Sequence, residues 1–136
     1  MDDKPLETAY LIDDQDIDRQ ISSLLLKKIN KRLTIYPIGS ARAALEKLRL
    51  SSVQDPDLLP DFIFLDIDMP EMNGWEFLSA YQELDIGRYK PVKIFVLSGL
   101  FGKEDIPDAI PAHLVKAVIS KPLSLDHIRD IFGHSR

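Results

Sequence analysis

A parallel α/β fold is predicted from the alternation of short apolar runs with amphipathic stretches along the 136 residues. Five apolar runs have strand character and are separated by segments too long for hairpins: 9–12, 33–38, 62–65, 92–97 and 117–119. The run 62–65 is apolar throughout, which is typical of a strand buried on both faces. This pattern predicts right-handed crossovers and a (βα)5 three-layer sandwich.

The first two helices are predicted from apolar residues at helical spacing. The first helix has one apolar face, made of Ile17, Ile21, Leu24, Leu25 and Ile29. Ser40 is the expected N-cap of the second helix. The inward side of that helix is expected to consist of Ala41, Ala44, Leu45 and Leu48. The polar, proline-bearing stretch 51–60 is predicted to be a loop.

The later helices are less uniform. Trp75, Phe77 and Tyr81 are expected to enter the core from a helix over 75–84. The region 103–114 is expected to hold a helix that is short or irregular, because Pro107 and Pro111 interrupt it. A closing helix over 125–132 is predicted after Ser124, its cap.

Composition narrows the class of protein. The chain has the length of one domain, with 45% hydrophobic and 29% charged residues, as in ordinary globular proteins. The absence of cysteine excludes disulfides, thiolate metal sites and a cysteine nucleophile. A net charge of −5 argues against a nucleic-acid or anionic-membrane surface. With neither a signal peptide nor an apolar run of the ~18 residues that span a bilayer, a soluble, cytoplasmic protein is expected.

Chemically useful side chains follow the apolar runs. Asp13 and Asp14 follow the first, Asp66 the third, Ser98 the fourth and Lys121 the fifth. In an open parallel sheet the carboxyl ends of the strands share one edge, where ligands bind beside the topological switch point. We therefore expect these five residues to converge on one pocket. Each residue alone has a structural explanation, as a helix cap, a turn former or a solvated surface residue, so only the joint pattern indicates a site.

Such a pocket suits phosphoryl chemistry. Three crowded carboxylates repel one another, and oxygen ligands without cysteine or a nearby histidine favour Mg²⁺. This ion can orient and neutralise a phosphoryl group, and a carboxylate can accept that group as an aspartyl-phosphate. Lys121 would then pair with one phosphoryl oxygen, and the Ser98 hydroxyl would donate a hydrogen bond to another.

At this point the motifs resemble those of a response-regulator receiver domain. The resemblance rests on Leu11-Ile12-Asp13-Asp14, the pattern D-x-x-M-P-x-M-N-G over 66–74, Ser98-Gly99 and Lys121-Pro122. It extends over about 8–132 and is strongest for the stand-alone, chemotaxis-regulator-like type. The resemblance implies a flavodoxin-like fold with strand order 2-1-3-4-5, and one receiver domain over 1–136 is expected, without an output domain.

The resemblance also implies a role for each site residue. Asp66 matches the phosphoacceptor of the family. Asp13 and Asp14 match the acidic pair that holds Mg²⁺, with Asp14 as the direct ligand and Asp13 acting through water. The Asp66 carboxylate and the backbone carbonyl of Asp68 would be further metal ligands. The donor would be a phosphohistidine on a sensor histidine kinase or a histidine phosphotransfer protein.

On the signalling side, Ser98 matches the switch hydroxyl, and Lys121 matches the lysine that pairs with the phosphoryl group. The bond from Lys121 to Pro122 is usually cis in this family. One departure is Val118, which stands three residues before the lysine, where the family usually has a rotating aromatic residue. A second is the proline-bearing region 103–114. Asp68 places a carboxylate beside the incoming phosphoryl group, so we expect it to alter the lifetime of the phosphorylated state.

The sequence predicts a single-domain response regulator of a two-component system or phosphorelay. Mg²⁺-dependent phosphorylation of Asp66 would change a surface that binds a downstream protein, and the chain would be a monomer or a weak dimer rather than an enzyme. One alternative is a pseudo-receiver that binds partners without phosphorylation. Another is a phosphatase of the haloacid-dehalogenase type, which Asp66-Ile67-Asp68 resembles, although Met69-Pro70 follows where that family has Thr or Val. Turnover of a generic phosphate ester would distinguish the phosphatase.

Overall fold

The computed structural model describes residues 7–100 and 102–132 of the chain. Its centre is a parallel five-stranded sheet with the order β2-β1-β3-β4-β5, which confirms the predicted flavodoxin-like topology. The strands are β1 (Glu7–Ile12), β2 (Leu33–Ile38), β3 (Phe62–Asp66), β4 (Lys93–Ser98) and β5 (Val115–Ser120).

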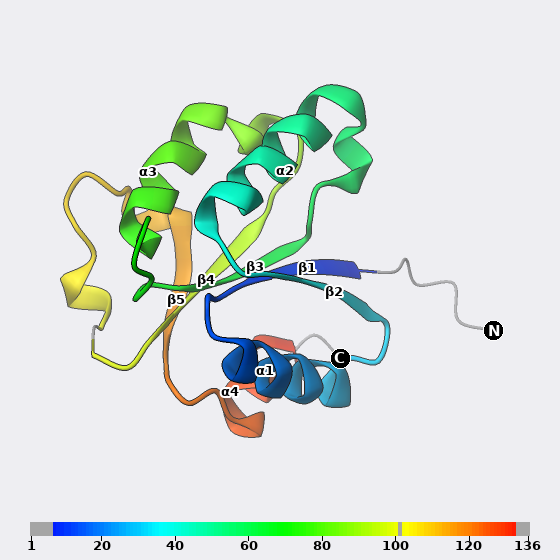
Figure 1. Ribbon diagram of the computed structural model, residues 1–136, viewed down its shortest axis with the longest axis vertical. Coiled ribbons are helices and arrows are strands. Elements are labelled where there is room, and N and C mark those ends of the chain that lie inside the picture. The colour runs from blue at the N-terminus through cyan, green and yellow to red at the C-terminus, as the bar shows by residue number, and fades with distance from the viewer. Residues whose placement is uncertain (1–6, 101, 133–136) are drawn as a thin grey trace.

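Helices cover both faces of the sheet (Figure 1). They are α1 (Asp16–Ile29), α2 (Ala41–Gln54), α3 (Gly74–Leu84) and α4 (Leu125–Phe132). In Figure 1, α2 and α3 lie on one face, while α1 and α4 lie on the other. Over the described ranges, no helix combines the length and the apolar character needed to cross a membrane.

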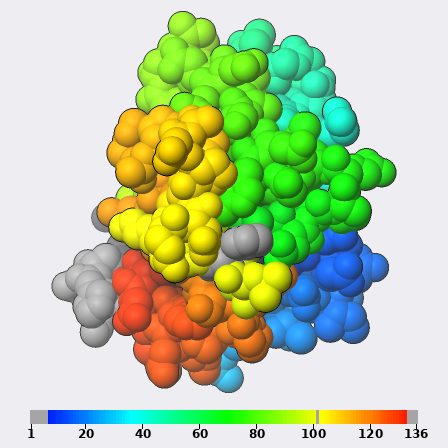
Figure 2. All heavy atoms as spheres, turned by 90° about the vertical axis from the view of Figure 1, so that its left-hand side faces the viewer, coloured from blue at the N-terminus to red at the C-terminus, as the bar shows by residue number. Residues whose placement is uncertain are grey.

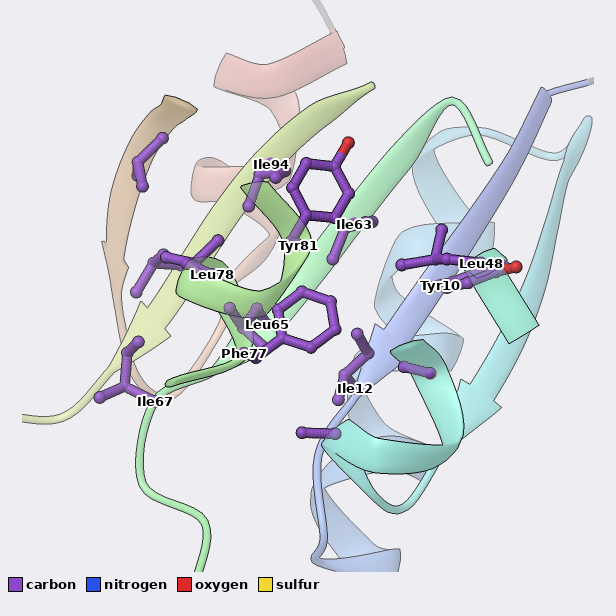
Figure 3. Close-up of a cluster of buried hydrophobic side chains, with 14 of the residues drawn as sticks. Tyr10, Ile12, Leu48, Ile63, Leu65, Ile67, Phe77, Leu78, Tyr81 and Ile94 are labelled. Atoms are coloured by element: carbon purple, nitrogen blue, oxygen red, sulfur yellow. The ribbon is translucent and has the colours of Figure 1, made fainter. Parts of the chain in front are cut away.

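Two hydrophobic cores hold the three layers together, one on each face of the sheet. On the face of α2 and α3, Phe77, Leu78 and Tyr81 pack over strand residues that include Ile63 and Leu65 (Figure 3). On the other face, α1 and α4 bury Leu26 and Ile128 against a group of stacked rings made by Phe62, Phe64 and Phe95. Every residue of β3 is buried, as its uninterrupted apolar run predicts.

The crossover from β4 to β5 differs most from the prediction. In place of the helix expected over 103–114, its described residues form two short 3-10 turns, η3 (Lys103–Asp105) and η4 (Ala112–Leu114). Pro107 and Pro111 explain the difference, because each lacks an N–H donor and its ring clashes with a preceding helical turn. Within the described chain the fold thus has five strands but four α-helices. Figure 2 shows this segment, in yellow and orange, on the surface between the green β3–α3 region and the red α4.

The predicted apolar face of α1 points only partly into the core, because Leu25 and Ile29 pack against it while the other three residues face solvent. Ile17, Ile21 and Leu24 are 66%, 50% and 72% exposed, whereas Ser22 and Leu26 are buried. Helical spacing identifies an apolar stripe but not the direction in which the helix docks on the sheet. The side of α1 that docks on the sheet consists of residues at helical spacing: Ser22, Leu25, Leu26 and Ile29.

The second helix is longer than predicted, and its start is as expected. The Ser40 hydroxyl accepts a hydrogen bond from the Ala43 N–H at 3.1 Å, as an N-cap does. The stretch predicted as a loop over 51–60 instead continues α2 to Gln54 and then forms a 3-10 turn, η1 (Pro56–Leu58). This turn begins after Asp55, whose side chain accepts the Asp57 N–H. The expected loop is thus mostly ordered helical structure.

Candidate functional site

Parallel pairing brings the ends of the central strands to one edge of the sheet. Asp66 at the end of β3 is in register with Leu97 of β4, and Ser98 of β4 is in register with Ser120 of β5. The Lys121 N–H donates to the Ser98 carbonyl at 2.9 Å, which ties the residue after β5 to the end of β4. The convergence expected from the sequence is therefore a consequence of strand register.

The carboxylates of Asp13, Asp14 and Asp66 form a cluster at this edge, with one oxygen of each lying within 4.8 Å of the others. Asp13 and Asp66 are buried, and Asp14 is half-buried. The Asp14 Oδ1 atom is inaccessible to solvent and has no hydrogen-bond partner. Since buried polar atoms are normally paired, this unpaired oxygen suits a ligand for a bound cation. An all-oxygen donor set of this charge fits Mg²⁺.

The ammonium group of Lys121 faces the cluster from the end of β5. The Lys121 Nζ atom lies 3.3 Å from Asp66 Oδ1, 3.4 Å from Asp13 Oδ2 and 3.4 Å from Asp18 Oδ2. The peptide bond from Lys121 to Pro122 is cis, as the family resemblance implies. Lys121 thus connects two of the clustered carboxylates to a third one on α1.

Burial and charge shape the electrostatics of the site. Burial, with the neighbouring Asp13 carboxylate, raises the pKa of Asp66 to about 6, although Lys121 and the Asp68 N–H act in the opposite direction. Burial lowers the pKa of Lys121, but the carboxylates of Asp66, Asp13 and Asp18 outweigh this and raise it overall. The ammonium group therefore stays charged while the acids compete for it.

The loop between β3 and α3 is closely packed beneath Asp66. The Asp68 N–H donates to Asp66 Oδ1 at 3.2 Å, while the Asp68 side chain is exposed. The Gly74 N–H donates to the Ile67 carbonyl at 3.0 Å, and a Cβ atom at Gly74 would lie 2.9 Å from Ile67 Cα. Helix α3 then starts with a reciprocal capping box between Asn73 and Glu76. That the Asp68 carbonyl holds a metal ion stays a prediction.

The loop between β1 and α1 is held by a residue that the sequence analysis did not single out. The Arg19 guanidinium donates to the Asp13 carbonyl at 2.5 Å and pairs with Asp16 one turn earlier. The Gln15 N–H donates to Asp13 Oδ1 at 2.9 Å. The backbone and side chain of Asp13 are therefore both fixed before any ligand binds.

Asp18 is the second residue that the sequence analysis missed. It lies in the first turn of α1, whereas Asp14 precedes the helix. The sequence offers no local signal for its role, because its partner Lys121 is 103 residues away in the chain. Only the tertiary structure shows that the two meet.

Ser98 and Val118 lie on the side of the site toward β5. Ser98 is buried, and its hydroxyl accepts the Leu100 N–H at 3.1 Å. Val118 is half-buried and packs against the core beneath α2 and α3. The switch role expected for Ser98 stays a prediction.

An open pocket lies beside Asp14, the half-buried member of the cluster. Its volume is about 600 Å³, and its lining includes Asp14, Gln15, Asp68 and Trp75. Trp75, expected in the core, is thus only partly buried and borders the site. Since the chain has one tryptophan, its fluorescence reports on this pocket.

Comparison with known proteins agrees with this geometry. Residues 9–132 match the family described as the response regulator receiver domain. A two-component response regulator of Oryza sativa subsp. japonica is 32% identical over 92 residues, which are 66% of this chain and 38% of that protein. The chain therefore spans well under two thirds of that relative's length.

Solved structures share the fold. A two-component response regulator from Cytophaga hutchinsonii has a TM-score of 0.76 at 23% identity, with 96% of this chain and 97% of that chain covered. The receiver domain of the histidine kinase CKI1 from Arabidopsis thaliana, complexed with Mg²⁺ and BeF₃⁻, has a TM-score of 0.75 at 25% identity. That comparison covers 96% of this chain and 91% of the other.

Proposed function

The chain belongs to the response regulator receiver domain family, and we propose that it accepts a phosphoryl group from a phosphohistidine onto Asp66. Receiver domains are regulatory phosphoacceptor domains rather than conventional enzymes. The observation that carries the proposal is the buried cluster of Asp13, Asp14 and Asp66 with Lys121 at its edge. Phosphorylation would change a surface that binds a downstream protein.

In the proposed transfer, a carboxylate oxygen of Asp66 attacks phosphorus. The new oxygen–phosphorus bond forms while the phosphorus–nitrogen bond of the donor breaks, and the imidazole nitrogen keeps that electron pair. The Asp68 N–H and Lys121 orient the Asp66 carboxylate before the donor arrives. The pKa of about 6 leaves Asp66 mostly ionised at neutral pH, as a nucleophile requires.

Asp13, Asp14 and the Asp68 carbonyl would hold Mg²⁺ beside the acceptor. The unpartnered, buried Asp14 Oδ1 supports this assignment. Bound there, the ion would neutralise charge on the phosphoryl oxygens. The receiver domain of CKI1 has been solved with Mg²⁺ and the phosphoryl analogue BeF₃⁻, which supports the same chemistry for this chain.

Lys121 and Ser98 would contact the phosphoryl group and so respond to phosphorylation of Asp66. Lys121 would pair with one phosphoryl oxygen, and the Ser98 hydroxyl would donate to another. Ser98 now accepts the Leu100 N–H, so its movement would reach the segment that follows β4. Because Val118 has no aromatic ring to rotate, the non-helical crossover between β4 and β5 is the part that would carry the change.

The exposed side of α1 is the proposed docking surface for the phosphohistidine protein. Ile17, Ile21 and Leu24 form an apolar stripe that starts three residues after Asp14 and is open to solvent. An exposed apolar stripe of this kind is typical of a surface that contacts a partner. Its place beside the carboxylates suits a donor that must bring its histidine to Asp66.

The mass of the intact protein tests the proposal. After incubation with a small-molecule phosphoryl donor and Mg²⁺, the parent should gain one phosphoryl group, and Asp66→Asn should gain none. Acetyl phosphate and phosphoramidate are suitable donors, because the second contains a phosphorus–nitrogen bond. Asp57→Asn, which removes an exposed acid from η1, is the matched control and should behave as the parent does.

A parent that gains no phosphoryl group from either donor or from a phosphorylated histidine phosphotransfer protein would contradict the proposal. The pseudo-receiver would then be the better explanation. Uptake that persists in Asp66→Asn would place the acceptor at another residue.

A further inference from the structure

Lys121 has one more carboxylate partner than its proposed role requires. Its Nζ atom contacts Asp66 and Asp13, which belong to the cluster, and also Asp18 Oδ2 at 3.4 Å. An ammonium group has three N–H donors, which these carboxylates now share. When Asp66 carries a phosphoryl group, its oxygens would compete with Asp13 and Asp18 for the ammonium group.

We propose that Asp18 is a positioning residue that holds the Lys121 ammonium toward α1 and so makes its pairing with a phosphoryl group on Asp66 less favourable. The inference rests on the proposed function and adds to it a regulatory brake on the phosphorylated state. Asp18 would not touch the reacting atoms. It would act through Lys121 alone.

Differences in burial identify Asp18 as the partner that is exchanged. The Asp13 side chain is 2% exposed, so it cannot be solvated if the ammonium group leaves, whereas the contact with Asp66 passes to the phosphoryl group that Asp66 then carries. The Asp18 side chain is 44% exposed, and water can replace Lys121 there at low cost. Losing the Asp18 contact is therefore the least unfavourable route to a free N–H donor.

The location of Asp18 also favours a brake rather than a metal ligand. It lies on α1 after the loop that carries Asp13 and Asp14, and it is not one of the three carboxylates grouped within 4.8 Å. Its charge draws the ammonium toward the helix and opposes an incoming anion. Both effects disfavour a phosphoryl group beside Lys121.

The first test measures beryllofluoride binding at saturating Mg²⁺ through the fluorescence of Trp75. Asp18→Asn should bind this phosphoryl analogue about two- to fivefold more tightly than the parent, which is the range for a partly exposed ion pair. Asp18→Glu keeps a carboxylate and should stay close to the parent. Thermal unfolding of each variant verifies that it folds.

Two controls distinguish the effect of the contact between Asp18 and Lys121 from the effect of removing one negative charge. Asp16→Asn removes an exposed carboxylate from the same turn of α1 that pairs with Arg19 rather than Lys121, and it should change the affinity less than Asp18→Asn does. In a Lys121→Met background the effect of Asp18→Asn should disappear. A gain as large in Asp16→Asn, or one that persists without Lys121, would overturn the inference.

A metal-free measurement distinguishes failure of the inference from failure of the proposed function. In the presence of a chelator, a double-mutant cycle of Asp18→Asn and Lys121→Met should show coupling of about two- to fivefold in the unfolding equilibrium constant. Absence of coupling would overturn the inference even if Asp66 is phosphorylated. A parent that shows the coupling but binds no beryllofluoride and gains no phosphoryl group would overturn the proposed function, and the brake with it.

Discussion

Two consecutive crossovers cover the same face of the sheet by different means. Between β3 and β4, one regular helix, α3, buries Phe77 and Leu78. Between β4 and β5, the described backbone forms only short 3-10 turns, yet Ile106 and Ile110 pack on the same core. The comparison shows that this sheet face requires apolar cover, which irregular backbone supplies as well as a helix does.

The two crossovers also hold different parts of the candidate site. The one with α3 carries the loop after Asp66, where capping and the close approach of Gly74 fix the backbone. The irregular one follows Ser98, and few internal hydrogen bonds join its described residues. We therefore expect the loop after Asp66 to be rigid and the crossover after Ser98 to have the lower local stability.

The greatest loss of stability is expected from truncating a core side chain. Two single variants, one in each crossover, compare the two regions. Phe77→Ala should cost about 3 to 5 kcal/mol of unfolding free energy, because the rigid helix cannot fill the cavity. Ile110→Ala should cost only about 2 kcal/mol, the low end for a buried isoleucine, since irregular backbone can collapse into the space. Urea unfolding of both variants at an unchanged m-value measures the two losses. Equal losses would show that the second crossover is as rigid as the first.

A pair of glycines tests the same contrast more locally. At Gly74 a Cβ atom would lie 2.9 Å from Ile67 Cα and 3.0 Å from the Asp66 carbonyl oxygen, whereas at Gly99 it would meet no atom within 4 Å. Gly74→Ala should therefore cost about 2 to 3 kcal/mol through forced backbone shifts. Gly99→Ala, the matched control, should change stability by less than about 0.5 kcal/mol. If Gly74→Ala costs as little stability as Gly99→Ala, the loop between β3 and α3 is not rigid.

The pH dependence of stability should differ between the ends of two neighbouring strands, because β3 ends in the ionisable Asp66 and β4 ends in the neutral Ser98. Because the pKa of Asp66 rises from 3.8 to about 6 on folding, the folded state binds more protons in this interval. The metal-free protein should therefore lose roughly 2 to 3 kcal/mol of stability as the pH rises from 4 to 7.

Asp66→Asn should remove most of this loss. Since the substitution also removes the Lys121 contact, the net gain at pH 7 should be about 1 to 2 kcal/mol, with little change at pH 4. Thermal unfolding in chelator at both pH values is the measurement. Ser98→Ala should keep the pH dependence of the parent. Destabilisation of Asp66→Asn at pH 7 would show that the Lys121 contact outweighs burial.

A weaker effect than these is expected for Asp68, whose exposed carboxylate lies at the mouth of the pocket. A carboxylate there can accept a hydrogen bond from the water that attacks the phosphoryl group. Asp68→Asn should therefore slow dephosphorylation about two- to fivefold, the size of one exposed charge. Loss of phosphorylated mass with time measures the rate, with Asp57→Asn as the control. Rates identical to the parent would contradict a role for Asp68 in the lifetime.

The strand ends were predictable because their signal is local. A buried parallel strand needs an uninterrupted apolar run, and the polar residue that ends the run marks the edge of the sheet. Asp66 and Lys121 are identified in this way from the sequence alone. Right-handed crossovers then make the strands parallel, so that their carboxyl ends meet at one edge.

The direction of α1 was not predictable by the same means. Its apolar stripe at Ile17, Ile21 and Leu24 is real, but it faces solvent. Predicting burial from an amphipathic pattern assumes that the apolar side meets the core of the same chain, and these three residues of α1 do not meet that assumption. The helical stretch 51–54 was missed because nearby prolines and polar residues suggested a loop, although Pro56 stands only after α2 ends.

The amino-acid sequence alone was enough to identify the strands, their parallel arrangement and the five polar residues at their ends, because each depends on hydrophobic pattern and backbone chirality within a short stretch. Packing in three dimensions selected which side of α1 is buried, how the chain returns from β4 to β5, and that Lys121 meets Asp18. These features depend on contacts between segments far apart in the chain. The energies that select them arise only when the layers come together.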